Sequence, residues 1–164
     1  MQFDLLFTSK EKIYKKYLLQ IIEKIKQNYH SMGLMASGEF EKQLEILIED
    51  NKLSILGAKH TFFMENGRRA GRFPPRKAIE DWIKVKKGLP TEFYEKPKQF
   101  AFIIARKIAK EGIKVPNENN KGRVASEIID NFLAKDLEKM LKELGVAIVE
   151  RLKSDLIQVL KIAA

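Results

Sequence analysis

Arginine is the residue type whose spacing in this sequence points most directly to chemistry. Four of the seven arginines fall within nine residues: Arg68, Arg69, Arg72 and Arg76. They lie in a segment, Glu65 to Pro75, whose two glycines and two prolines favour an irregular loop. Guanidinium groups bind carboxylates and phosphates through charge-assisted, often paired hydrogen bonds. We therefore predict that these arginines, with Phe73 as an apolar anchor, form a subunit or partner interface. The alternative is a solvated connector whose arginines pair locally.

The other residue types with reactive side chains do not form a recognisable catalytic or metal site. His30 and His60 are the two histidines, thirty residues apart, without the carboxylate spacing of a zinc motif. Ser37 lacks the glycine that a nucleophile elbow has two residues before its serine. No Walker lysine follows the Gly67–Gly71 pair, and there is no cysteine. We predict a protein that is not an enzyme and that needs no metal and no cofactor.

Composition sets the broad class of the protein. The chain has 164 residues, which fits a single domain over residues 1–164. Its net charge of +9 favours contact with nucleic acid or with acidic protein surfaces. The longest apolar run is six residues, Phe100 to Ala105, whereas a membrane span needs about 18. The sequence starts without a signal-peptide pattern, so we expect a soluble intracellular protein that does not enter a membrane.

The first half of the chain changes from helical to strand periodicity. Thr8–Glu11 has the pattern of a capping box, which predicts a helix from Thr8 to about Tyr29. Residues 44–56 alternate in polarity around Asp50–Asn51, which predicts a hairpin and the nucleus of the sheet. His60–Glu65 is expected to form a helical turn that packs its aromatic residues and is closed by Gly67.

Prolines and glycines mark the helices of the second half. Pro75 and Gly88 delimit one predicted helix, with Trp82 as its core anchor, and Pro97 and Gly112 delimit another. After a polar loop, leucines and isoleucines at steps of three and four predict a long C-terminal helix, bent at Gly145. The predicted fold class is α+β: a helix-rich domain in which amphipathic helices pack a small antiparallel hairpin, with a long C-terminal helix.

The order of these motifs resembles a family of siphophage tail components, also called neck, head–tail joining or tail-completion proteins. The resemblance is sharpest over residues 62–112 and looser elsewhere. Outside that range it includes Ala36–Phe40. Within that range the similar segments are Phe62–Gly67, Pro74–Pro75, Ala78–Ile83, Ala105–Ala109 and Gly112. The chain departs from the family at Pro116–Asn119, where members often have an aromatic pair.

This resemblance implies a structural virion protein in the head–tail junction of a tailed bacteriophage. It implies a homo-oligomeric ring, with a hexamer as one option, between the portal complex and the tail tube. Expected partners are portal, adaptor or stopper proteins on one side and tail tube or terminator proteins on the other, close to passing phage DNA. The protein would be assembled in the host bacterial cytoplasm and reside in the neck of the virion.

A basic nucleic-acid-binding module is the alternative function, and it depends on the net charge and the arginine cluster. The sequence contains no recognition helix or RNA-binding signature that would favour it. A small enzyme of unrecognised type is a third option.

Overall fold

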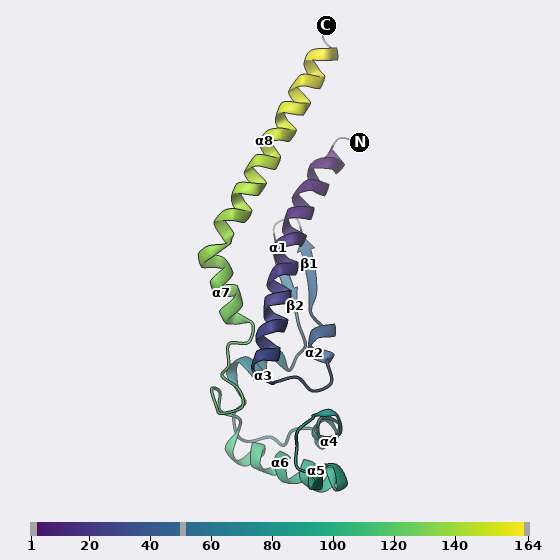
Figure 1. Cartoon of the computed structure of the whole chain (residues 1–164), viewed down its shortest axis with the longest axis vertical. Coiled ribbons are helices and arrows are strands. Elements are labelled where there is room, and N and C mark those ends of the chain that lie inside the picture. The colour runs from purple at the N-terminus through teal and green to yellow at the C-terminus, as the bar shows by residue number, and fades with distance from the viewer. Residues whose placement is uncertain (1–2, 50–51, 163–164) are drawn as a thin grey trace. The chain divides into compact units, whose positions relative to one another are not determined.

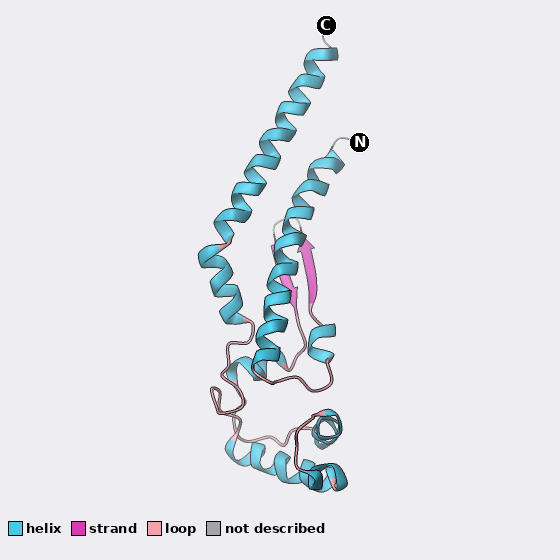
Figure 2. Ribbon diagram, in the orientation of Figure 1, coloured by secondary structure: helices cyan, strands magenta, loops and turns pink. Residues whose placement is uncertain are grey.

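The computed structural model describes the backbone of residues 3–49 and 52–162 and the side chains of residues 10–49 and 52–157. Its elements follow one another in this order (Figure 1): α1 (Phe3–Ser31), α2 (Glu39–Lys42), β1 (Glu45–Glu49), β2 (Lys52–Leu56), α3 (Thr61–Asn66), α4 (Arg76–Val85), α5 (Thr91–Glu95), α6 (Pro97–Glu111), α7 (Ser126–Lys135) and α8 (Leu137–Ile162). Helices make up 64% of the chain, and the described strands form a two-stranded antiparallel sheet (Figure 2). The expected α+β fold class is confirmed.

The described contacts divide the chain into two compact units. The first unit combines residues 1–24, 46–55 and 127–164, and the second combines residues 25–45 and 56–126. The single domain expected over residues 1–164 stays a prediction.

In the first unit, α1 packs against α7 and α8 through a small apolar core. Tyr17, Met140 and Leu144 are buried at its centre. At the edge of this core, Glu143 accepts hydrogen bonds from Lys16 Nζ at 2.8 Å and from the Tyr17 hydroxyl at 2.8 Å. These bonds, that of Lys16 first, hold the pKa of Glu143 below its ordinary value. Asp136 links the two sides of the unit as well, because it pairs with both Lys24 and Lys139.

The second unit has its own buried side chains. Phe40 is 1% exposed, and its ring lies 4.4 Å from that of Tyr29. Asn28 Nδ2 donates to the carbonyl of Val124 at 2.9 Å, and Val124 is fully buried. Beyond the arginine loop, α4 packs chiefly against α6, where Ala101 and Ala105 are buried. Small side chains at these two positions allow the two helices to approach closely.

Several sequence predictions of local structure are confirmed. Strands occupy both halves of the predicted hairpin, although its expected turn residues, Asp50 and Asn51, lie outside the described residues. The helical turn before Gly67 is present as α3, and Pro97 and Gly112 flank α6 as expected.

Other predictions of local structure are wrong. α1 begins at Phe3, so Thr8 lies inside the helix and cannot be its N-cap. The predicted long C-terminal helix, by contrast, is confirmed as α8, and Gly145, where a bend is expected, lies inside this helix and does not end it. Trp82 is not the core anchor of α4, because 39% of it is exposed while Ile83 is fully buried. The expected packing of Phe62 and Phe63 is also wrong, since they are 65% and 44% exposed.

Candidate functional site: an arginine–phenylalanine surface

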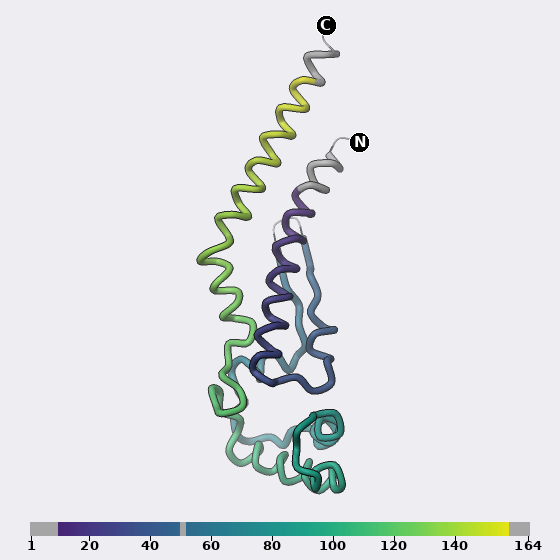
Figure 3. The backbone as a smooth tube through the Cα atoms, in the orientation of Figure 1, coloured from purple at the N-terminus to yellow at the C-terminus, as the bar shows by residue number. Residues whose placement is uncertain are grey.

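The loop between α3 and α4 is fixed to the C-terminal end of α6. Arg68 and Ile113 exchange two backbone hydrogen bonds, of 2.8 and 2.7 Å, and the Gly71 amide donates to the Ala109 carbonyl at 2.7 Å. Figure 3 follows this stretch of backbone alongside α6. A regular backbone bridge of this kind makes the loop a platform for its side chains, not a free connector.

Two glycines with positive φ make this close approach feasible. Gly67 has a φ of 72° and Gly112 a φ of 74°. A Cβ atom added to Gly67 would overlap the Ile113 carbonyl oxygen, and one added to Gly112 would overlap the Arg68 carbonyl oxygen. Any other residue at either position would meet both a steric clash and an unfavourable backbone conformation.

The first part of the surface combines arginines with an exposed aromatic pair. The Arg68 guanidinium lies 6.0 Å from the centre of the Phe63 ring and donates a 2.7 Å hydrogen bond to the Arg72 carbonyl. The Phe62 and Phe63 rings meet edge to face at 5.9 Å. A surface hollow of about 570 Å³ is lined by these groups: Phe62, Phe63, Asn66, Gly67, Arg68, Arg69, Ala70 and Arg72. Of the described side chains, none that lines this hollow is acidic.

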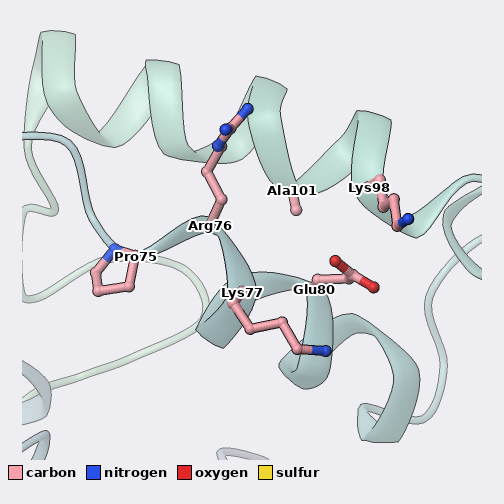
Figure 4. A pocket seen from close by; sticks show the side chains of 6 residues that line it. All are labelled: Pro75, Arg76, Lys77, Glu80, Lys98 and Ala101. Atoms are coloured by element: carbon pink, nitrogen blue, oxygen red, sulfur yellow. The ribbon is translucent and has the colours of Figure 1, made fainter.

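The second part of the surface lies where the loop enters α4. The Phe73 ring stacks on that of Phe102 at 6.2 Å, and the Arg76 guanidinium lies 5.9 Å from the same Phe102 ring. Figure 4 shows Arg76 reaching from the start of α4 toward α6. Here a hollow of about 530 Å³ is lined by Pro75, Arg76, Lys77, Glu80, Lys98 and Ala101.

Glu80 contributes a carboxylate to this second hollow, but it pairs with Lys84, which does not line the hollow. Lys84 Nζ contacts its Oε1 at 2.6 Å. This hydrogen bond is the main reason why the pKa of Glu80 lies below its ordinary value. Among the described side chains, none forms an ion pair with Arg68, Arg69, Arg72 or Arg76. These guanidinium groups therefore keep most of their donors available to an external acceptor.

The five interface residues predicted from sequence all lie in the second unit, along one stretch of backbone: Arg68, Arg69, Arg72, Phe73 and Arg76. The structure brings three aromatic residues to them that sequence reasoning did not assign to the interface: Phe62, Phe63 and Phe102. The sequence signal for Phe62 and Phe63 is their adjacency, because neighbouring residues on a short helix cannot both face one core. Phe102 could not have been found without the stacking partner that the loop supplies.

Sequence reasoning also treated the two histidines as isolated, whereas both lie beside α2. His30 pairs with the Glu41 carboxylate, and the His60 ring lies 6.2 Å from that of Phe40. Partial burial lowers the pKa of His60, while the Glu39 carboxylate opposes the shift. Over the part of the chain that is described, no group of three potential metal ligands occurs, around these histidines or elsewhere.

Comparison with known proteins found no matching family model, no similar curated protein and no similar solved structure. Within the described residues, no helix has the length and apolarity that crossing a bilayer requires.

Proposed function

We propose that this chain is a non-enzymatic structural subunit of the head–tail junction of a tailed bacteriophage, and that the arginine–phenylalanine surface is where it docks onto a neighbouring protein. The observation that carries the proposal is the set of four arginines without carboxylate partners among exposed aromatic rings.

The composition of this surface fits a protein interface. Arginine and aromatic residues are the types most enriched at the centres of protein interfaces and among their energetic hot spots. The platform is fixed by backbone hydrogen bonds, so docking costs little ordering of the loop. An acidic surface would supply the carboxylates that the chain itself does not place there.

The location in a phage neck comes from the resemblance of residues 62–112 to tail-completion proteins. In that setting the chain forms a homo-oligomeric ring between portal and tail tube, in contact with adaptor or stopper proteins and with terminator proteins. Ring closure requires two different complementary patches on each subunit. The arginine–phenylalanine surface is proposed as one of these patches.

Nucleic-acid binding is the second candidate function, favoured by the same feature. Arginines interleaved with exposed phenylalanines resemble the combination that binds single strands, in which phosphates meet cations and bases stack on rings. The hollow of about 570 Å³ that Phe62 and Phe63 line would fit a base as well as a side chain of a partner protein. The two candidates differ in salt dependence and in what remains after the arginines are removed.

The experiment is complementation in a phage that encodes this chain. Deletion of its gene should give DNA-filled heads that do not join tails. Wild-type protein should restore tailed particles, whereas the triple variant Arg68→Ala, Arg69→Ala, Arg72→Ala should not. A matched control, Lys12→Ala, Lys15→Ala, Lys52→Ala, removes the same charge from exposed positions outside the surface and should restore them. Normal infectious particles from a folded triple-arginine variant would refute the role of this surface, and tailed particles from the deletion itself would refute the neck function.

A further inference from the structure

The C-terminal helix α8 carries two apolar faces, and the first unit uses one of them. Leu137, Met140 and Leu144 face the core with Tyr17. A second set of aliphatic side chains, here called the α8 outer face, is 44–64% exposed: Leu141, Ile148, Val149, Leu152 and Leu156. At 3.6 residues per turn, these five residues and Gly145 lie on one stripe beside the core-facing stripe.

No described element of the first unit covers the outer face. The C-terminal part of α8 extends beyond the start of α1 (Figure 2). Gly145 lies within the stripe, and a Cβ atom built there meets nothing within 4 Å. Contiguous exposed aliphatic residues at helical spacing are typical of a helix that packs against another helix in an assembly.

The charge of this region indicates what kind of partner fits the outer face. Residues 126–164 contain six basic and seven acidic side chains, a net charge of −1, whereas the whole chain has a net charge of +9. The positive excess is therefore confined to residues 1–125. A nucleic acid or a strongly acidic protein would select those basic parts of the chain and gain nothing from α8.

A second copy of α8 meets the requirements of the outer face. It offers the same aliphatic stripe, and its mixed charges impose no net repulsion. Charges beside the stripe are already neutralised within one helix, as shown by Lys142 and Glu138, which pair at 2.7 Å. The open side of Gly145 allows an aliphatic side chain of the second copy to pack against the α8 backbone.

We propose that the α8 outer face packs against the same face of a second copy of this chain, giving a symmetric homodimer. The proposal does not depend on the phage function, since it rests on the first unit and not on the arginine–phenylalanine surface. Five half-exposed aliphatic side chains supply less than the roughly 800 Å² per partner of a standard interface. The dimer should therefore be reversible, with a dissociation constant on the order of micromolar.

Sedimentation equilibrium of the full chain tests the proposal, over about 1 to 100 μM protein. The expected mass rises with concentration from 19.0 kDa to twice that value. Leu152→Glu places a charge in the centre of the stripe and should weaken dimerisation at least about tenfold. Leu141→Lys, at the N-terminal end of the stripe, should also weaken dimerisation. Circular dichroism should show unchanged helix content in both variants, because both positions are exposed.

Ser154→Glu is the matched control. Ser154 is exposed on the same helix, and at 3.6 residues per turn it lies on the side opposite the stripe. This variant should leave the dissociation constant unchanged. The proposal is overturned by a wild-type chain that stays monomeric throughout, by equal weakening from Ser154→Glu and Leu152→Glu, or by an oligomer that survives both stripe variants. A triple-arginine variant that still dimerises but fails in complementation would separate this interface from the arginine–phenylalanine surface.

Discussion

The packing of α4 on α6 should depend on Ile83 far more than on its neighbour Trp82. Ile83 is the fully buried residue of α4, which packs chiefly against α6, whereas 39% of Trp82 is exposed. Truncation of a fully buried isoleucine to alanine removes its transfer free energy and leaves a cavity, at a cost of about 2–5 kcal/mol. Ile83→Val leaves a smaller void and should cost about 0.5–1.5 kcal/mol.

The change at Trp82 should be milder despite the larger side chain. Truncation of a buried tryptophan costs about 3–5 kcal/mol, but here a large part of the ring already contacts solvent. We expect Trp82→Ala to cost less than about 2 kcal/mol. Ile103→Ala on α6 is a control, since Ile103 is 50% exposed and its truncation should cost about 1 kcal/mol or less.

Thermal unfolding followed by circular dichroism measures these differences. For a chain of this size, each kcal/mol lowers the midpoint by about 2–4 °C. Ile83→Ala should therefore lower the midpoint by roughly 5–15 °C, and Trp82→Ala by only a few degrees. If Trp82→Ala proves the more destabilising of the two, the orientation of α4 described here is wrong and the sequence prediction of a tryptophan anchor is right.

Three further predictions concern the site and its support. At the start of α7, Glu65 accepts hydrogen bonds from the Ala125 amide at 2.5 Å and from the Ser126 hydroxyl at 2.7 Å. Glu65→Ala should therefore lower the free energy of unfolding, measured in urea, by about 1–2 kcal/mol. The control Glu118→Ala, at an exposed position, should change this free energy little. The pKa of His60 is lowered on folding, so its contribution to stability is complete above its ordinary value of 6.5 and is lost as pH falls through the folded-state value. His60→Gln should therefore flatten the melting temperature between neutral and mildly acidic pH, and an unaltered profile would argue against this burial. A salt titration of DNA binding distinguishes the two candidate functions. If the logarithm of the affinity falls with the logarithm of the salt concentration with a slope of magnitude near 3, and this slope disappears with the triple-arginine variant, these arginines contact phosphates. The docking function predicts weak DNA binding with a shallow slope.

The sequence was informative wherever one local rule decided the structure. Alternation over residues 44–56 gave the hairpin, and proline and glycine positions gave both ends of α6. The same rules failed where tertiary contacts decided. Apolar periodicity placed Trp82, Ile79 and Ile83 on one face of α4, but it could not tell which of them is fully buried. The ion pair of Asp136 with Lys24 joins residues 112 positions apart in the chain, which no local rule predicts.

For the candidate site, sequence found the charges but not the geometry that makes them a surface. The composition of Glu65–Pro75 predicted a loop, and the arginines within it were visible at once. The bridge from Arg68 to Ile113 depends on two glycines 45 residues apart, Gly67 and Gly112, each of which was interpreted only as the end of a helix. Their second role, close backbone approach, becomes visible only when α3 and α6 are placed together.

The two proposed interfaces should respond to salt in opposite directions, because their chemistry differs. Contacts made by Arg68, Arg69 and Arg72 are charge-assisted and exposed, so added salt screens them. Contacts made by Leu141, Ile148 and Leu152 are aliphatic, and exclusion of salts such as sulfate from protein surfaces strengthens such burial. Sodium sulfate should therefore release an acidic partner from the second unit while it favours self-association through α8. A single sodium sulfate titration that follows both partner release and self-association can then assign each association to its own surface without any substitution.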